Sequence, residues 1–173
     1  MHSKTCLASV VLASLIPATL VQAAPAAGDR EITIQGTGTS DNEFDNNAFS
    51  ASASYGWFMS DQGFWGIRQS VSVVDTPDSS SSWNGGTRLF YDWHFDADAW
   101  QPFIGVSGGY LYGEDTNETF SAGPEIGVKY YVKDKTFVGV SAEYQFLFDD
   151  SDDIDDNYDD GAVFYNVGVG FNF

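Results

Sequence analysis

Six ionisable residues of this chain could do chemistry together. All fall at alternate positions of largely apolar segments, and they are Arg68, Arg88, Asp92, Glu125, Lys129 and Glu143. Three bases facing three carboxyls can neutralise one another, carry an ion or move a proton. Proton transfer near neutral pH usually needs a histidine. Beyond residue 23 the only histidine is His94, so the sequence does not favour an enzyme.

The composition excludes several classes of protein. The chain has 7 Lys and Arg against 25 Asp and Glu, a formal net charge of -18, which disfavours nucleic acid as a partner. Its 173 residues, 43% of them hydrophobic, suit one folded domain. Cys6 is the only cysteine and lies in the N-terminal apolar segment, so residues 24–173 hold no disulfide, thiol nucleophile or cysteine-based zinc site.

The first 23 residues have the pattern of a secretory signal peptide. Lys4 gives a positive start, residues 5–20 form an apolar core, and Val21-Gln22-Ala23 is a small-residue cleavage motif. We therefore expect cleavage after Ala23 and a mature domain of residues 24–173. An N-terminal membrane anchor is the alternative, but the apolar run is shorter than the roughly 20 residues that a spanning helix needs.

Beyond this segment, apolar residues alternate with period two, the pattern of β-strands, and helical periodicity is absent. Eight such segments cover residues 31–39, 47–59, 64–74, 87–95, 101–113, 119–132, 136–148 and 162–173. Their lengths are those of tilted strands that cross a bilayer. Short connections alternate with longer polar ones, which predicts an antiparallel up-and-down meander with tight turns at one end. In the longer connection after residue 74, Trp83 is expected at a loop tip.

The alternation gives each segment two faces. In residues 87–95, for example, Leu89, Tyr91, Trp93 and Phe95 lie opposite Arg88, Phe90, Asp92 and His94. The apolar face would fill the interior of a soluble barrel but would meet lipid in a membrane barrel. With alternating strand directions the aromatic residues gather at two heights, as in the aromatic belts of the two bilayer interfaces. We therefore predict an all-β, eight-stranded antiparallel transmembrane β-barrel.

The six ionisable residues would then share a narrow lumen, because an eight-stranded barrel is only wide enough for side chains. Charges buried there must be paired, since an unpaired buried ion costs several kcal/mol. We predict that the six form a structural polar network. A gated path for ions or solutes is the alternative. Lumen-facing glycines such as Gly105, Gly127 and Gly170 would leave room for water but hardly for a continuous pore.

The last segment, AVFYNVGVGFNF, alternates up to its final residue. It resembles the C-terminal strand of bacterial outer-membrane proteins, in which terminal aromatic residues, here Phe171 and Phe173, are read by the barrel-assembly machinery. The stretches QPFIGVSGGYLYG and AGPEIGVKYYVKDKTFVGVSAEYQFLF also resemble the small eight-stranded outer-membrane β-barrels, a family that includes OmpX-like proteins and the OmpA membrane domain. The resemblance implies a monomer in the outer membrane of a Gram-negative bacterium, in contact with lipid and lipopolysaccharide.

The four longer connections contain 16 acidic residues and no Lys or Arg, and eight of the acids lie between Asp149 and Gly161. Ligands that are all oxygen favour Ca²⁺ or Mg²⁺. The pattern is not an EF-hand, because counting from Asp153 the sixth residue is Tyr158 and the twelfth is Phe164. A solvated acidic loop and loose binding of divalent cations at Asp149 to Asp160, shared with lipopolysaccharide phosphates, both stay open. We expect no cofactor and no dedicated metal site.

The resemblance also sets the functional expectation. We expect a non-enzymatic outer-membrane protein with a structural or surface-interaction role, such as envelope integrity or loop-mediated contacts. The alternative, from a different class, is a narrow porin-like channel or transporter for small solutes or apolar molecules.

Overall fold

The computed structural model describes residues 25–40, 47–75, 82–113, 119–148 and 162–173, and of these the side chains of residues 37–40, 47–49, 74–75 and 162 are not described. The predicted signal peptide and most of the four longer connections lie outside these residues. No helix among the described residues is long and apolar enough to cross a membrane.

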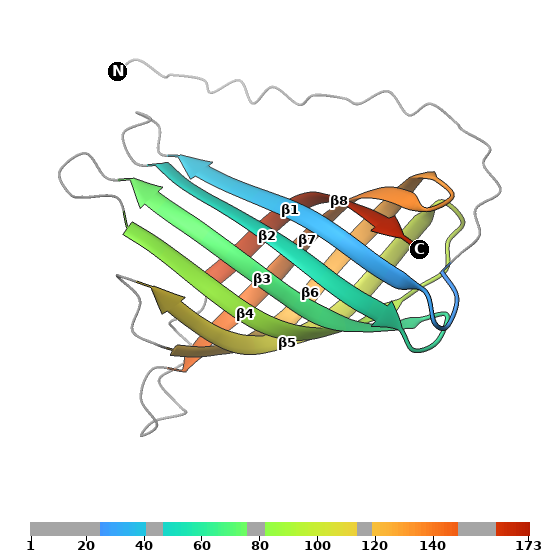
Figure 1. Cartoon of the computed structure of the whole chain (residues 1–173), viewed down its shortest axis with the longest axis horizontal. Coiled ribbons are helices and arrows are strands. Elements are labelled where there is room, and N and C mark those ends of the chain that lie inside the picture. The colour runs from blue at the N-terminus through green and yellow to red at the C-terminus, as the bar shows by residue number, and fades with distance from the viewer. Residues whose placement is uncertain (1–24, 41–46, 76–81, 114–118, 149–161) are drawn as a thin grey trace, which may run out of the picture.

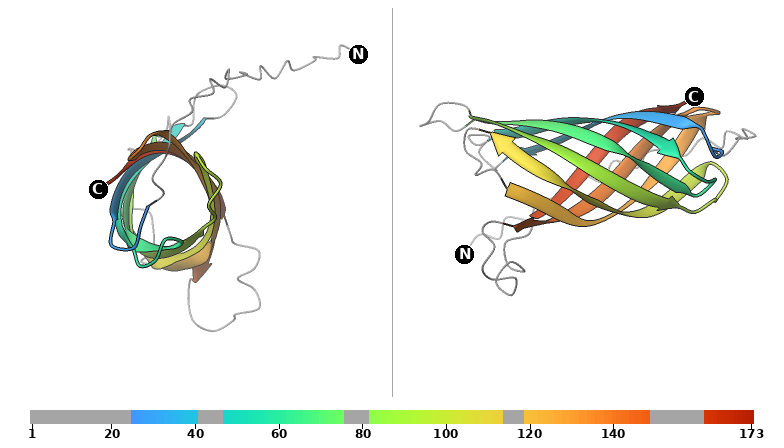
Figure 2. Two further views of the ribbon diagram at one scale, coloured as in Figure 1. Left: turned by 90° about the vertical axis from the view of Figure 1, so that its right-hand side faces the viewer. Right: turned by 60° about the horizontal axis from the view of Figure 1, so that its bottom comes forward.

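The described residues form eight antiparallel strands in one closed barrel, strongly tilted against the barrel axis (Figure 1). The strands are β1 (Arg30–Ser40), β2 (Asn47–Phe58), β3 (Gly63–Asp75), β4 (Ser82–His94), β5 (Trp100–Gly113), β6 (Thr119–Lys133), β7 (Thr136–Phe148) and β8 (Ala162–Asn172). Each strand pairs with its neighbours in sequence, and the end-on view shows a complete ring (Figure 2). The predicted fold class is therefore confirmed.

Pairing between β1 and β8 closes the ring. The register runs from Glu31 opposite Asn172 to Gly36 opposite Val167. Closure matters because backbone N–H and C=O groups at an open sheet edge would have no hydrogen-bond partner in lipid. The chain can therefore cross a bilayer with its strand backbones satisfied internally.

The predicted strand boundaries agree with the structure to within one residue, except at the start of the fourth strand. β4 begins at Ser82 rather than residue 87, because its first residues extend the ladder with β3, pairing Trp83 with Val73 and Asn84 with Ser72. The expectation that Trp83 lies at a loop tip is thus wrong. Backbone pairing with β3 overrides a local Ser, Asn and Gly composition that is typical of turns.

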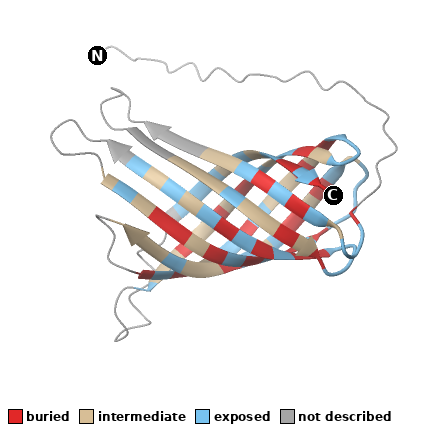
Figure 3. Cartoon of the chain, in the orientation of Figure 1, coloured by how far each residue is buried: buried red, intermediate tan, exposed pale blue. Residues whose placement is uncertain are grey.

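Burial alternates along the strands (Figure 3). The outward-facing Ile34, Ile126 and Val167 are 60%, 61% and 63% exposed, whereas the inward-facing Arg68 and Glu143 are 5% and 1% exposed. A continuous apolar exterior around an ionic interior is the reverse of a water-soluble barrel and matches a lipid environment.

Aromatic side chains mark both ends of this apolar exterior. At the end with the short turns, Trp57 stacks on Trp65 with ring centroids 4.7 Å apart, and Trp100 packs against Tyr130 at 4.6 Å. Towards the end with the longer connections, the ring centroids of Phe120 and Phe148 lie 5.8 Å apart. Such rows are expected where a barrel wall meets the two interfaces of a bilayer.

Candidate functional site in the barrel lumen

All six ionisable residues predicted to face the lumen lie inside the barrel. None is more than 7% exposed. They come from β3, β4, β6 and β7, and alternation along each strand directs them inward. The structure joins five of them in ion pairs and leaves Asp92 outside those pairs.

Glu143 is the centre of the first cluster. Arg68 donates a bidentate pair of hydrogen bonds to Glu125, at 2.9 and 3.0 Å, and its Nη1 also lies 3.3 Å from Glu143. Arg88 Nη1 and Ser107 Oγ donate to the other oxygen of Glu143. These contacts join β3 and β4 to β6 and β7 across the lumen. Bidentate arginine–carboxylate pairs have fixed geometry, so the cluster braces opposite walls of the barrel.

Lys129 and Glu31 form a second ion pair nearer the short turns. Lys129 Nζ lies 2.8 Å from both carboxylate oxygens of Glu31. Four phenylalanine rings surround the same ammonium, with centroids 4.8 to 5.8 Å away, at Phe58, Phe64, Phe103 and Phe137. A desolvated cation over aromatic faces gains cation–π attraction in addition to its ion pair. The sequence interpretation missed Glu31, although Glu31, Thr33 and Gln35 alternate with Ile32 and Ile34.

Asp92 lies in the lumen without an ion pair among the described residues. Its Oδ1 is buried and has no hydrogen-bond partner there. It borders a cavity of about 30 Å³ that Arg68 and Lys129 also line, which is room for about one water molecule. With Glu31 included, the buried lumen residues in the described part of the chain carry four carboxyl groups and three basic groups, so Asp92 is the carboxyl left over.

Six buried aromatic rings of the described residues pack together in the lumen towards the end with the short turns, and we call them the aromatic plug. They are the rings of Phe58, Phe64, Phe90, Phe103, Tyr131 and Phe137, each at most 5% exposed. Gly127 faces the ring of Phe103 and Gly170 faces the ring of Phe137, and a Cβ at either glycine would overlap that ring. These two glycines therefore make space for rings, not for water as the sequence suggested.

His94 is embedded in this plug. Its ring centroid lies 5.4 Å from those of Phe58 and Phe103, and its Nδ1 lies 3.4 Å from the carbonyl oxygen of Gln62. Its Nε2 is buried without a hydrogen-bond partner in the described part of the chain. Among the residues that the structure describes, His94 makes no hydrogen bond to a nucleophile or an acid that it could activate.

The opposite half of the lumen is hollow. A cavity of about 220 Å³, which we call the serine cup, is walled by Ser50, Ser52, Ser70, Ser72, Asn84, Gln145, Phe164 and Asn166. Arg68, Arg88 and Glu143 form its floor. The serines are half-buried while the floor residues are buried, so the cup is more accessible at its walls than at its floor. The lumen therefore changes from open and polar to closed and aromatic along the barrel axis.

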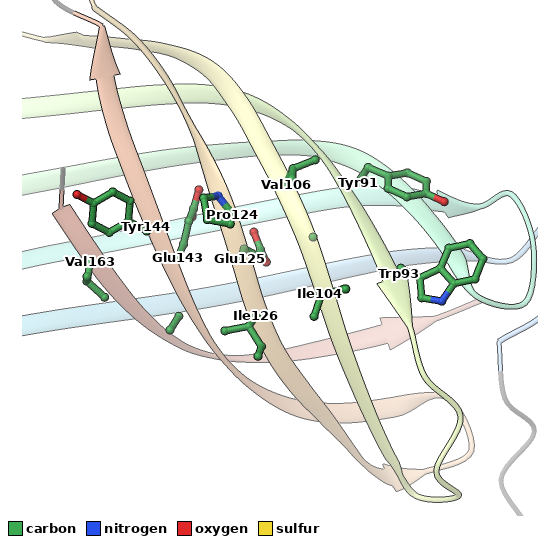
Figure 4. Close-up of a pocket in the computed structure, with 12 residues that line it drawn as sticks. Tyr91, Trp93, Ile104, Val106, Pro124, Glu125, Ile126, Glu143, Tyr144 and Val163 are labelled. Carbon is green, nitrogen blue, oxygen red and sulfur yellow. The ribbon is translucent and has the colours of Figure 1, made fainter. Parts of the chain in front are cut away.

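The outer wall carries a shallow apolar groove that extends from β4 across β5, β6 and β7 to β8 (Figure 4). Ile104, Val106 and Ile126 line it, with Tyr91 and Trp93 at one side. At Pro124 in this groove, the β6–β7 register has no assigned pair between Ala122 with Phe146 and Glu125 with Glu143, consistent with the missing proline N–H. The groove lies on the outer face of the barrel and is lined mainly by apolar side chains. The ionisable groups that could do chemistry lie in the lumen instead.

The predicted assembly signal lies at the end of the ring. Phe171 and Phe173 are 48% and 42% exposed on the outside, and their rings stack at 6.2 Å. Phe173 also exchanges backbone hydrogen bonds of 2.9 and 3.0 Å with Arg30. Both rings are therefore accessible from outside the barrel, and their role in assembly stays a prediction.

The described residues contain no group of three or more His, Cys, Asp or Glu able to hold a metal ion. The acidic segment Asp149 to Asp160 lies outside the described residues, so loose cation binding there stays a prediction.

No protein-family model and no curated protein matches this sequence. Solved structures do match. Neisserial surface protein A aligns with a TM-score of 0.60 at 13% identity, over 84% of this chain and 96% of its own. The outer membrane protein OprG from Pseudomonas aeruginosa aligns with a TM-score of 0.56 at 12% identity, over 86% and 97%.

Identities this low establish the fold and no more. The expected resemblance is thus confirmed at the level of architecture. With its closed ring, apolar exterior and aromatic rows, the chain has the fold of the small eight-stranded outer-membrane β-barrels.

Proposed function

We propose that this protein is a non-enzymatic, non-conducting barrel of the outer membrane, with a structural role and a role in surface contacts made by its longer connections. The observation that carries the proposal is the closed half of the lumen. The aromatic plug and the Lys129–Glu31 pair lie buried in the lumen between the serine cup and the short turns, and the cavity beside them has a volume of only about 30 Å³.

The plug opposes conduction for an energetic reason. A passing ion would have to displace several rings that are at most 5% exposed and separate Lys129 from Glu31 in a desolvated setting. Breaking a buried ion pair leaves an uncompensated charge, at about 3 to 5 kcal/mol. The ionic network is therefore best explained as a brace that holds the barrel cross-section.

The arrangement around His94 gives no support to catalysis. The histidine is 1% exposed and packs among phenylalanines, whereas general acid–base chemistry needs a base within hydrogen-bond reach of a substrate. In the same proposal the barrel is monomeric, is inserted by the barrel-assembly machinery through Phe171 and Phe173, and contacts lipopolysaccharide. Divalent cations at Asp149 to Asp160 would bridge its acidic connections to lipid phosphates.

A narrow channel is the second candidate, because half of the lumen is already hollow. Planar-bilayer recordings separate the two. We expect the wild-type barrel to give no discrete conductance steps, and a Phe64→Ala/Phe137→Ala double variant, which removes two plug rings, to give them. Conductance steps from the double variant would show that the recordings detect barrels inserted in the bilayer. Wild-type conductance steps that disappear in Glu143→Leu would instead establish a channel.

A further inference from the structure

We propose that the serine cup is a binding site for a small uncharged polyhydroxyl solute of about monosaccharide size, which enters from the end of the barrel with the longer connections. The structural role proposed above assigns no ligand, so this inference goes beyond it. It depends on the geometry of the open half of the lumen.

The walls of the cup present hydroxyl and amide groups from several strands. Ser50 faces Ser72 and Ser52 faces Ser70 across the β2–β3 ladder, and Asn84 and Asn166 come from β4 and β8. A hydroxyl can both donate and accept, so these walls suit a ligand that does the same.

Two of these serines make long hydrogen bonds within the barrel. Ser52 Oγ lies 3.4 Å from Gln35 Oε1, and Ser70 Oγ lies 3.4 Å from the carbonyl oxygen of Gly86. Hydroxyl hydrogen bonds are usually about 2.7 to 2.8 Å long. Both hydroxyls can therefore gain a shorter bond by turning to a ligand.

The floor of the cup has donors that lack acceptors. Nε of Arg68 and Nε of Arg88 are buried without a hydrogen-bond partner among the described residues, on side chains only 5% and 8% exposed. A buried N–H without an acceptor costs about 1 to 3 kcal/mol, and because these two atoms have almost no accessible surface, a ligand would recover that loss only by turning the guanidinium groups towards the cup.

The charges nearby favour a neutral ligand over an anion. Glu125 and Glu143 already neutralise the two guanidinium groups of the floor. The sequence as a whole carries a net charge of -18, which lowers the local concentration of anions. A neutral polyhydroxyl solute supplies acceptors without this repulsion.

The size and lining of the cup also suit a molecule of monosaccharide size. Its volume of about 220 Å³ equals that of about seven water molecules at liquid density, which is close to the bulk of one sugar ring. Phe164, 39% exposed, gives the wall an apolar face that can cover the C–H side of such a ring. Because the aromatic plug closes the other end, the solute would bind and leave through the same opening.

The test uses the full mature barrel refolded in detergent micelles, with glucose as the probe and saturation-transfer NMR of the sugar as the readout. We expect a signal from wild type with millimolar affinity. Ser52→Phe, which fills the cup, should weaken binding at least tenfold. Ala53→Phe, at the next residue but facing lipid, should stay within twofold of wild type. Ser50→Leu is a milder second filling variant, and heat-modifiable gel mobility checks that each variant is folded.

Three results would overturn the proposal. One is no transfer from folded wild type up to 100 mM glucose, an upper concentration set at about a hundred times a 1 mM Kd. Another is unchanged binding in both folded filling variants. The third is binding of inorganic phosphate that displaces glucose, since this would make the cup an anion site.

Discussion

Replacing one lumen carboxyl group at a time should distinguish the ion-paired carboxylate that holds the barrel walls together from the carboxyl group that has no ion pair among the described residues. Glu143→Gln and Asp92→Asn make the same chemical change, a carboxyl to an amide, in residues that are 1% and 3% exposed. Charge counting alone predicts similar effects, because each variant leaves three carboxyl groups facing three basic groups. The structure predicts different effects, because Glu143 binds Arg68, Arg88 and Ser107, whereas Asp92 is not in an ion pair of the described residues.

The magnitudes follow from those partners. Glu143→Gln removes the carboxylate that pairs with Arg88 and one of two that pair with Arg68, and an uncompensated buried charge costs about 3 to 5 kcal/mol. The amide oxygen still accepts a hydrogen bond, so we expect a loss near 3 kcal/mol. Asp92→Asn keeps the shape and replaces a carboxyl group that has no ion pair among the described residues, so we expect a change below about 1 kcal/mol in either direction.

Urea unfolding of the barrel refolded in phospholipid vesicles, followed by tryptophan fluorescence, measures both variants. With a slope of about 2 kcal/mol per M, Glu143→Gln should lower the unfolding midpoint by about 1.5 M and Asp92→Asn by less than about 0.5 M. Equal shifts for the two variants, or a larger shift for Asp92→Asn, would refute the brace around Glu143.

Three further predictions concern other parts of the barrel. Lys129→Met should cost about 3 kcal/mol of unfolding free energy because Glu31 stays buried without its partner, and Lys129→Met/Glu31→Leu should regain most of it; a double-mutant cycle with additive losses would contradict the pair. Gly123→Ala should destabilise the barrel by at least about 2 kcal/mol, because its Cβ would overlap backbone atoms of the neighbouring strand, whereas Gly139→Ala meets only ordinary contacts; equal unfolding midpoints would refute this difference. Phe173→Lys should reduce assembly into the outer membrane, and unchanged heat-modifiable mobility and yield in membrane fractions would show that this ring is dispensable.

The strands were predictable because a barrel wall has the strongest possible contrast between its two faces. Ile126 and Val128 alternate with Glu125 and Lys129 along one strand, and no helical pattern competes with that alternation. The same parity was enough to place Arg68, Arg88 and Glu143 inside. β4 was predicted too short because its first residues have the Ser, Asn and Gly composition of a turn, and pairing with β3 overrides that local signal.

The partners within the lumen needed the register and the diameter of the ring. Parity does not tell whether Arg68 reaches Glu125, Glu143 or Asp92, since that depends on the height of each residue and on distances across the barrel. The aromatic plug was missed because Phe64 and Phe103 are apolar residues at inward positions, against the rule that apolar side chains face lipid. Glycines opposite the rings, such as Gly127, were the available signal, because a ring that crosses to the next strand needs a neighbour without a side chain.

The central claim is that the apolar outer face of the barrel contacts hydrocarbon, and quenching of tryptophan by brominated acyl chains tests it most directly. Trp65, Trp93 and Trp100 are 39%, 40% and 44% exposed on the outer wall. The protein reconstituted in vesicles of brominated lipid should therefore lose most of its tryptophan fluorescence relative to vesicles of ordinary lipid. A mature chain that stays folded in buffer without detergent, with tryptophan fluorescence that brominated lipid leaves unchanged, would contradict the claim.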